Sequence, residues 1–278
     1  MLGGGLTGGM SFKRPRIMGV VNVTPDSFSD GGRYSGVQAA VAHGLRLVAE
    51  GADILDIGGE STRPGAEPVE MAEELTRVIP VIMGLRQAWD GPISIDTLKP
   101  TVARSAISVG ATIWNDVSAL GGEMAVQSAL ELNCEVILMH MQGEPRTMQE
   151  SPAYLDVVAE VTTWLKGRAD EALAAGIKRE KISLDPGIGF GKTLEHNVAL
   201  LRGLDRIKAL GFPVVLGVSR KRMIQAIDPT ATSPDDRLGG SLALALHGAR
   251  MGAAVLRVHD VRETVQALEM LERLEGDQ

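Results

Sequence analysis

The sequence contains a single cysteine, Cys134, so no disulfide can form within one chain. Cys134 stands directly before an apolar run that begins at Glu135. This position predicts a buried, inert thiol in a reducing compartment, and a reactive thiol is the alternative.

Aromatic residues, excess positive charge and long apolar runs are also scarce. Aromatic residues make up 3% of the chain, so an aromatic in a polar loop is a candidate for contact with a ligand. The 28 basic and 35 acidic residues give a net charge of −7, which argues against general binding of nucleic acids or anionic membranes. The longest apolar stretches have the length of a strand and are too short to cross a membrane.

The chain begins with a Gly-rich stretch. Met1–Gly9 has neither the basic start nor the apolar centre of a signal peptide. We expect residues 1–14 to be a flexible leader, residues 15–278 to form a single domain, and the protein to be cytoplasmic.

Eight short apolar runs, each followed by a helix-like segment, are the main pattern in the sequence. Runs rich in Val, Ile and Leu predict strands that are buried on both faces. Strands that alternate with helices predict a parallel sheet, and eight such units predict an α/β fold of the (β/α)8 TIM-barrel class. The runs are Ile17–Asn22, Asp53–Gly58, Pro92–Asp96, Thr112–Asp116, Glu135–His140, Ile182–Asp185, Pro213–Ser219 and Val255–His259.

Polar residues stand within or at the end of each run. In a TIM barrel the carboxyl ends of the strands and the loops after them form the active-site face. So many polar groups on one rim indicate a site rather than packing alone. They are Asn22, Asp56, Asp96, Asn115, Asp116, His140, Asp185, Ser219, Arg257 and His259.

The segments between the runs carry helix boundary signals. Ala153–Ala175 is the longest helical pattern and ends before Gly176. Leu238–Met251 is apolar around most of its circumference, as in a deeply buried helix or one covered by a second subunit. We favour the second reading and expect a homodimer, with Ala245 in the contact.

Two polar loops after the first strands are unusually long, residues 24–32 and 59–66. Long loops on this rim are usually lids or ligand clamps, and plain solvated turns are the alternative. Phe28 favours the first reading, because aromatic residues are rare in this chain.

The run ending at Asp185 leads into a Gly-rich segment, Pro186–Lys192. A buried carboxylate needs a cation, a metal or N–H donors, and the glycines let the backbone approach a flat ligand on which Phe190 could stack. The segment resembles part of a phosphate loop but lacks the full Walker spacing.

Cations gather after the second, seventh and eighth strands, where barrels often hold phosphate. They are Arg63, Arg220, Lys221, Arg222, Arg257 and His259. Structural salt bridges with the carboxylates are the alternative. The five histidines lack zinc-ligand spacing, and His43, His196 and His247 are expected in helices. Asn22 is a hard oxygen ligand that suits Mg²⁺, which keeps several waters and binds substrate phosphates.

These segments together resemble the dihydropteroate synthases, a pterin-binding family that sulfonamides inhibit. The matching stretches run from the first strand to the last: Ile17–Gly32, Asp53–Gly65, Ile93–Thr97, Asn115–Asp116, Leu138–His140, Asp185–Lys192, Gly217–Lys221 and Arg257–Asp260. The resemblance implies a transferase of folate biosynthesis. Its reaction joins 4-aminobenzoate to 6-hydroxymethyl-7,8-dihydropterin diphosphate and yields 7,8-dihydropteroate and diphosphate.

The resemblance also implies roles for individual residues. Asp96, Asn115, Asp185, Lys221, Met139 and Gly217 are implied around the pterin. Asn22, Thr62, Arg63, Arg257 and His259 are implied around the diphosphate, with Asn22 as the ligand of Mg²⁺. Phe28, Pro64, Phe190, Ser219 and Lys221 are implied around 4-aminobenzoate. Asp96, Lys221 and Arg63 are implied in catalysis.

Two alternatives remain. A pterin-binding methyltransferase domain uses Asp and Asn for the pterin, but it has no use for the diphosphate clamp that Arg63, Arg257 and His259 would form. A non-catalytic paralogue is expected to have lost a loop residue, and none is missing in this sequence.

Overall fold

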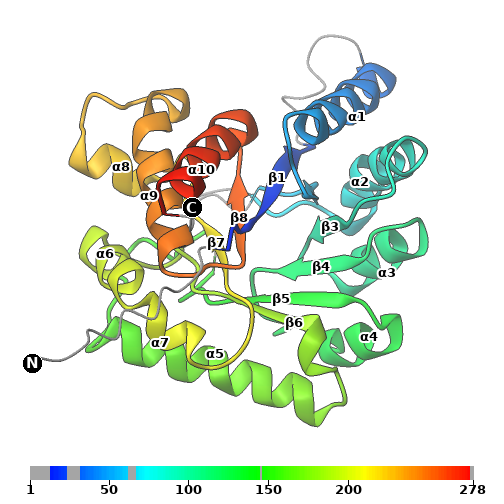
Figure 1. Cartoon of the computed structure of the whole chain (residues 1–278). Helices are drawn as coiled ribbons and strands as arrows, with labels where there is room; N and C mark the ends of the chain where they lie inside the picture. The colour runs from blue at the N-terminus through cyan, green and yellow to red at the C-terminus, as the bar shows by residue number, and fades with distance from the viewer. Residues whose placement is uncertain (1–12, 24–31, 62–66, 145, 276–278) are drawn as a thin grey trace, which may run out of the picture.

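Eight parallel strands surrounded by helices form the fold (Figure 1), as the sequence pattern predicts. The computed structural model describes residues 13–23, 32–61, 67–144 and 146–275. The strands are β1 (Arg16–Asn22), β2 (Ile54–Gly58), β3 (Ile93–Asp96), β4 (Ile113–Asp116), β5 (Glu135–Met139), β6 (Ile182–Asp185), β7 (Val215–Gly217) and β8 (Val255–Val258).

Each strand is followed by at least one helix in the described part of the chain. The helices are α1 (Gly32–Ala49), α2 (Met71–Arg86), α3 (Pro100–Ser108), α4 (Ala125–Leu132), α5 (Val157–Ala174), α6 (Leu194–Arg202), α7 (Leu204–Lys208), α8 (Arg222–Ile227), α9 (Leu238–Arg250) and α10 (Val261–Glu275). The short 3-10 helices η2 (Arg179–Lys181) and η3 (Pro234–Arg237) precede β6 and α9.

The sheet curves until its two edge strands meet. Its order is β6-β5-β4-β3-β2-β1-β8-β7, and neighbouring strands in this order pair in parallel. A parallel bridge between Leu184 and Val214 joins β6 to the start of β7, where the Leu184 N–H donates to the Pro213 carbonyl at 2.9 Å. The predicted (β/α)8 barrel is confirmed.

The side chains inside the barrel separate into an apolar lower layer and a polar upper layer. The apolar layer lies near the amino ends of the strands and consists of Met18, Ile54, Ile113, Ile137, Val215 and Val255. Since side chains alternate along a strand, the next inward position on β2, β4 and β8 is Asp56, Asn115 and Arg257. The larger apolar core, with Leu55, Trp114 and Leu216, lies on the outward strand faces under the helices. The buried Asp56, Asn115 and Arg257 therefore lie toward the carboxyl end of the barrel.

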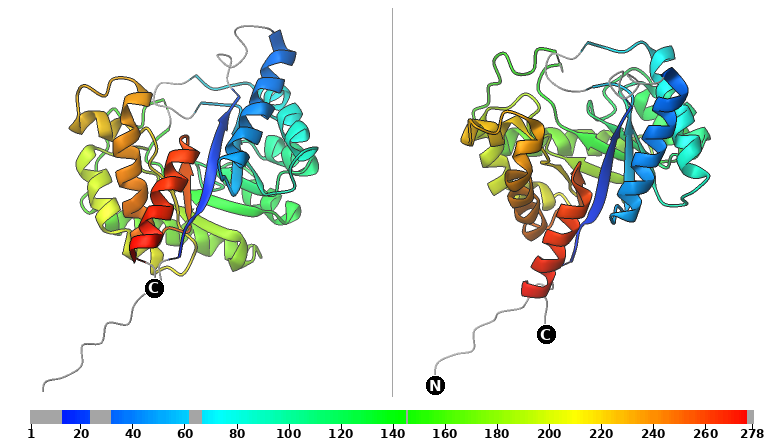
Figure 2. Two further views of the ribbon diagram at one scale, coloured as in Figure 1. Left: turned by 45° about the horizontal axis from the view of Figure 1, so that its top comes forward. Right: turned by 90° about the horizontal axis from the view of Figure 1, so that it is seen from above.

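The views in Figure 2 show that β1 runs away from the C-terminal end of α10. Because all strands are parallel, the loops that follow them lie at the opposite end of the barrel from that terminus. This end is the face on which the sequence places the functional residues.

Two helices differ from their predicted form. The helix predicted over 153–175 begins at Val157, because the Asp156 side chain accepts hydrogen bonds from the N–H groups of Val158 and Ala159 and caps it. Some of the apolar residues around α9 are explained by packing within the subunit. Ala245 is only 2% exposed and packs within its own subunit. A Cβ at Gly248 would lie 2.4 Å from Leu216 Cδ2, so α9 sits tightly on β7.

Cys134 is buried at the start of β5, as predicted, and burial raises the pKa of its thiol to about 11. His43, His196 and His247 lie in helices, also as predicted. In the described ranges no helix is both long and apolar enough to cross a membrane.

Candidate active site

A pocket at the carboxyl ends of the strands collects all six residues implied around the pterin. Its lining also includes Arg257, Phe190, two further residues of the predicted Gly-rich segment, and Val117, which the sequence did not indicate. The lining is Asp96, Asn115, Val117, Met139, Asp185, Gly187, Ile188, Phe190, Gly217, Lys221 and Arg257. These residues come from β3, β4, β5, β6, β7, β8 and the loops after them.

A buried ion-pair network forms one side of this pocket. Arg257 Nε donates to Asp56 Oδ2 at 2.7 Å, and its Nη2 donates to Asp96 Oδ2 at 2.8 Å. Asp56 is 0% exposed, and its Oδ2 also lies 3.4 Å from Asn115 Nδ2. The guanidinium group of Arg257 thus bridges two carboxylates, and the salt bridge that the sequence left as an alternative is present here.

The charge state of Asp96 is finely balanced by this network. Burial raises the pKa of Asp96 to about 7, the positive charge of Arg257 opposes the rise, and Asp56 adds to it. The carboxyl group can therefore change charge near neutral pH.

Asp185 lies across the pocket and is 6% exposed. Its Oδ1 accepts a hydrogen bond from the Gly187 N–H at 2.7 Å. Its Oδ2 lies 4.0 Å from the position that a Cβ would take on Gly217, a pocket residue on β7. Burial raises the pKa of Asp185, while the Gly187 N–H and the charge of Lys221 oppose the rise. One carboxylate oxygen thus holds the loop, and the other faces the pocket.

Lys221 and Phe190 form a paired wall. Lys221 Nζ lies 4.4 Å from the centre of the Phe190 ring, a cation–π distance. Burial lowers the pKa of Lys221 to about 8, and Asp185 limits this decrease. A flat ligand placed against this wall would meet one aromatic face and one ammonium group.

His259 and Arg220, two other basic residues near the ends of β7 and β8, do not line the pocket. His259 is partly buried, and its Nδ1 lies 3.1 Å from Ser219 Oγ. Burial, with the charges of Arg257 and Arg220, lowers the pKa of His259 to about 3, so the imidazole is neutral. Arg220 makes two hydrogen bonds to Asp260 and an ion pair with Asp235, so it serves this loop structurally.

Asn22 ends β1 on the same face. A Cβ on Gly58 would lie 3.8 Å from Asn22 Oδ1 and 3.9 Å from Asp96 Oδ2, so the two oxygens flank the same point. Among the described residues no group of three or more His, Cys, Asp or Glu side chains could hold a metal ion. The Asn22 side-chain oxygen is of the kind that Mg²⁺ accepts as a ligand.

Four implied residues, Phe28, Thr62, Arg63 and Pro64, lie outside the described residues. The base of the second loop is described and well anchored. Lys99 pairs with Glu60 and with the buried Glu74, and Arg77 Nη1 donates to the Gly59 carbonyl at 2.7 Å. The sequence did not indicate these anchors, because ion pairs between distant residues carry no local signal.

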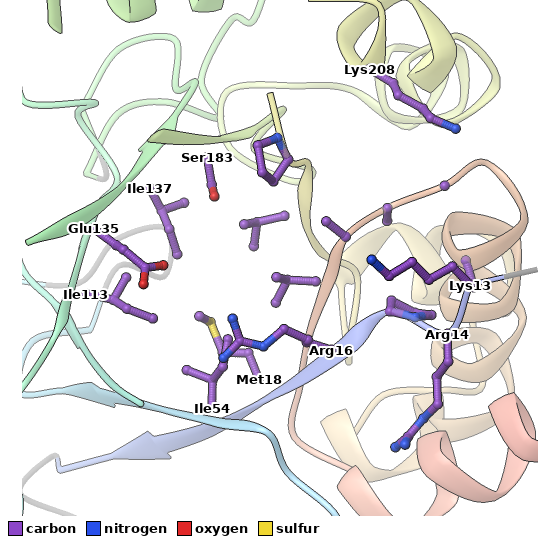
Figure 3. Close-up of a pocket in the computed structure, with 18 of the residues that line it drawn as sticks. Lys13, Arg14, Arg16, Met18, Ile54, Ile113, Glu135, Ile137, Ser183 and Lys208 are labelled. Carbon is purple, nitrogen blue, oxygen red and sulfur yellow. The ribbon is translucent and has the colours of Figure 1, made fainter. Parts of the chain in front are cut away.

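A larger cavity of about 630 Å³ lies at the opposite end of the barrel. Figure 3 shows Met18, Ile54, Ile113 and Ile137 pointing into it, with Arg16 and Glu135 beside them. None of the implied site residues that the structure describes lines this cavity. Size alone does not identify an active site, and the chemistry of a TIM barrel lies at the carboxyl ends of its strands.

Comparison with known proteins agrees with this geometry. Residues 18–259 match the family described as pterin binding enzyme. Dihydropteroate synthase of Escherichia coli K12 is 47% identical over 263 residues, which cover 95% of this chain and 93% of the relative. The enzyme of Neisseria meningitidis serogroup B is 50% identical over 267 residues, covering 94% and 93%.

Solved structures give the same result. Xanthomonas albilineans dihydropteroate synthase with 4-aminobenzoic acid has a TM-score of 0.90 and 50% identity, covering 96% of this chain and 95% of that one. The same enzyme in complex with 7,8-dihydropteroate has a TM-score of 0.86 and 47% identity, covering 97% of each chain. The chain therefore belongs to the pterin-binding enzymes, and within them to the dihydropteroate synthase family.

Proposed function

We propose that the pocket binds 6-hydroxymethyl-7,8-dihydropterin diphosphate and places its methylene carbon beside 4-aminobenzoate. Asp185 and Asn115 match the amide and amino groups of the pterin, and Met139 and Gly217 line the ring. Lys221 and Phe190, with Ser219, receive 4-aminobenzoate. Arg257, His259 and Asn22 lie toward the diphosphate, together with Thr62 and Arg63; Phe28 and Pro64 complete the aminobenzoate side.

The reaction exchanges one bond at the methylene carbon. The amine nitrogen of 4-aminobenzoate forms a C–N bond, the C–O bond to diphosphate breaks, and diphosphate departs with the electron pair. The nitrogen then loses a proton. The arylamine is a neutral nucleophile, so no strong base is required, and none of the described pocket residues forms a histidine-centred triad.

Electrostatic stabilisation is the main contribution of these residues. As the C–O bond weakens, positive charge develops on the methylene and the pterin. The Asp96 carboxylate is only 7% exposed, so its charge acts with little screening on that centre. The cations near the eighth strand and on the second loop favour the departing negative charge. Mg²⁺, when bound through Asn22, the diphosphate and water, would supply further positive charge there.

The gathering of Asp96, Asn115, Asp185 and Lys221 from four strands or loops around one pocket is the observation that carries this proposal. A turnover assay with the pterin diphosphate, 4-aminobenzoate and Mg²⁺ tests it. We expect equal amounts of 7,8-dihydropteroate and diphosphate, separated by chromatography. Pterin binding without product would favour a non-catalytic protein, and methyl transfer with a corrinoid partner would favour the methyltransferase alternative.

Activity should depend on the charge of Asp96. The pKa of Asp96 is about 7, so the carboxylate is ionised above this pH and protonated below it. We expect kcat/KM for the pterin diphosphate to fall about tenfold per pH unit below this value. The diphosphate also titrates, so the pH profile of the wild type is compared with that of Asp96→Asn. The variant should be slower, and its kcat/KM should lack the part of the pH dependence that is due to Asp96. An identical acid limb in both proteins would contradict the assignment.

We further propose that two copies associate through α9. Its exposed stripe includes the apolar residues Gly239, Leu242 and Ala243, which lie at helical spacing, and ends at the charged Arg250. Ala245, the position suggested by the sequence, faces inward and cannot report on this contact.

Ala243→Glu tests the association. A charge on this face should convert the dimer to a monomer if the face is buried between subunits, because an unpaired charge is costly in an apolar interface. Ala39→Glu, at an exposed alanine of α1, is the matched control and should remain dimeric. Sedimentation at micromolar concentration measures both, and a monomeric wild-type protein would rule the proposal out.

Sulfonamides are expected to compete with 4-aminobenzoate at this site. A structure of the Yersinia pestis dihydropteroate synthase with a sulfonamide drug complex is 43% identical to this chain, with a TM-score of 0.88. We propose the same competition here, in the cytoplasm.

A further inference from the structure

The loop between β6 and α6 contains a buried lysine, Lys192, that takes no part in the proposed reaction. Lys192 is 3% exposed. Its Nζ lies 2.9 Å from the Phe190 carbonyl oxygen, 3.0 Å from the Gly187 carbonyl oxygen and 2.9 Å from His140 Nδ1. An ammonium group this deeply buried normally pairs with a carboxylate, but all three of these partners are uncharged.

The charge states of these groups fit three donated hydrogen bonds. Burial lowers the pKa of His140 to about 3, and the charge of Lys192 contributes, so the imidazole is neutral and can accept at Nδ1. Burial lowers the pKa of Lys192 to about 7, Asp185 opposes this decrease, and Lys221 adds to it. Below that pH the ammonium group supplies one N–H to each acceptor.

Other side chains hold the later part of this loop: the Gly189 N–H donates to Asn197 Oδ1 at 2.7 Å, and the Tyr154 hydroxyl donates to the Gly191 carbonyl at 2.9 Å. Gly187, Gly189 and Gly191 have positive φ angles of 65°, 86° and 61°. A Cβ at Gly187 would lie 1.9 Å from the His140 carbonyl oxygen, so side chains are excluded where the loop presses on the end of β5. The Phe190 carbonyl accepts from Lys192, and the Gly187 carbonyl accepts both from Lys192 and from the Phe190 N–H at 3.1 Å, so the buried ammonium group joins these two positions.

Two features of the pocket depend on this loop. Its Gly187 N–H binds Asp185, and its Phe190 ring lies 4.4 Å from Lys221 Nζ. Lys192 holds the carbonyl groups of these same two residues, Gly187 and Phe190. Their backbone positions are thus fixed against His140 on the neighbouring strand end.

We propose that Lys192 is a positioning residue for 4-aminobenzoate: by fixing the Gly187 and Phe190 carbonyl groups against His140, it sets the Phe190 ring beside Lys221. The inference rests on the proposed function, in which Phe190 and Lys221 receive this substrate. It extends that function to a residue that does not touch the substrate.

Lys192→Met tests the inference, since it keeps the length of the side chain and removes the donors. We expect KM for 4-aminobenzoate to rise about tenfold, because the loop loses hydrogen bonds to two carbonyl groups. KM for the pterin diphosphate and kcat should change less than about threefold, because Asp185 and Asn115 are unchanged. A tenfold change would require the loss of about 1.4 kcal/mol of binding free energy. A structural role alone would reduce folded protein without separating these constants.

Lys181→Met is the matched control. Lys181 lies directly before β6, whereas the loop with Lys192 follows that strand. The Lys181 Nζ donates to the carbonyl and side-chain oxygens of Asn133. All kinetic constants should stay at wild-type values in this variant. An equal rise in KM for 4-aminobenzoate in both variants would overturn the proposal.

Gln149→Leu provides a second test that does not depend on folding of the first variant. Gln149 is exposed, and its Nε2 donates to the Gly189 carbonyl at 2.6 Å in the same loop. We expect KM for 4-aminobenzoate to rise about twofold to fivefold. If Lys192→Met does not fold, an unchanged KM in Gln149→Leu would overturn the inference.

The pH dependence of KM gives an independent readout. Above about pH 7 the neutral amine of Lys192 has two N–H donors for three acceptors. KM for 4-aminobenzoate should therefore rise as pH increases through this value in the wild type and in Lys181→Met, but not in Lys192→Met. Lys221, whose pKa is about 8, faces the same loop and is present in all three proteins.

The outcomes separate the two levels of the argument. Wild-type protein without turnover would overturn the proposed function and this inference with it. Normal wild-type turnover with unchanged KM values and pH profile in folded Lys192→Met would overturn this inference alone.

Discussion

Asp185→Asn should weaken binding of the pterin diphosphate by about 2–5 kcal/mol, as when one partner of a buried charged hydrogen bond is lost. Asn can still accept from the Gly187 N–H through its amide oxygen, so the loop should keep its shape. At the carboxylate oxygen that faces the pocket, Asp185→Asn replaces an anionic acceptor by an N–H donor. Calorimetric titration should show a loss of affinity of at least about thirtyfold.

Asp116→Asn is the matched control. Asp116 is also a buried carboxylate at the end of a strand, but it accepts from Ser118 and from the Leu120 N–H and does not line the pocket. Its substitution should lower stability and leave pterin affinity unchanged. Equal affinities of wild type and Asp185→Asn would show that Asp185 holds the barrel together and does not recognise the pterin.

Arg257→Met should lower the free energy of unfolding by about 3–5 kcal/mol, because it leaves buried charge without a partner. Asp56 is 0% exposed, and its Oδ1 has no hydrogen-bond partner among the residues that the structure describes. Without the guanidinium group, Asp56 and Asp96 would be two carboxylates in one interior with no cation between them. Urea unfolding at pH 8 measures this loss.

Arg104→Met shows what the same substitution does at the surface. Arg104 Nη2 lies 2.8 Å from Glu131 Oε2, and the side chains are 50% and 49% exposed. Loss of this pair should change the unfolding free energy by at most about 1 kcal/mol. Arg257→Met with a loss as small as that of Arg104→Met would show that the pairing of Arg257 with Asp56 and Asp96 does not stabilise the fold.

The fold could be predicted closely from the sequence because each strand is a local pattern. The runs at Ile182–Asp185 and Glu135–His140 agree with β6 and with β5 to within one residue. Helix starts were less certain, because capping depends on side-chain geometry. Asp156 caps α5 directly before its first residue, Val157, and residues 153–156 stay outside the helix.

The pterin side of the site was also accessible from sequence. Asp96 and Asp185 each end an apolar strand, Asn115 stands one residue before the end of β4, and parallel strands bring their carboxyl ends to one face. The partners of these residues were not accessible. Arg257 bonds carboxylates 201 and 161 positions away, and nothing in the sequence shows which cations of the rim are paired and which face a substrate.

The sequence by itself determined the barrel, the polar end of it and the residues that gather there, because strand periodicity and strand ends are properties of neighbouring residues. Only the tertiary structure decided that Arg257 is tied to Asp56 and Asp96, that Ala245 faces inward, and that Lys192 is enclosed by neutral acceptors. Burial and pairing depend on the packing of distant segments, and they set the charges on which the chemistry relies.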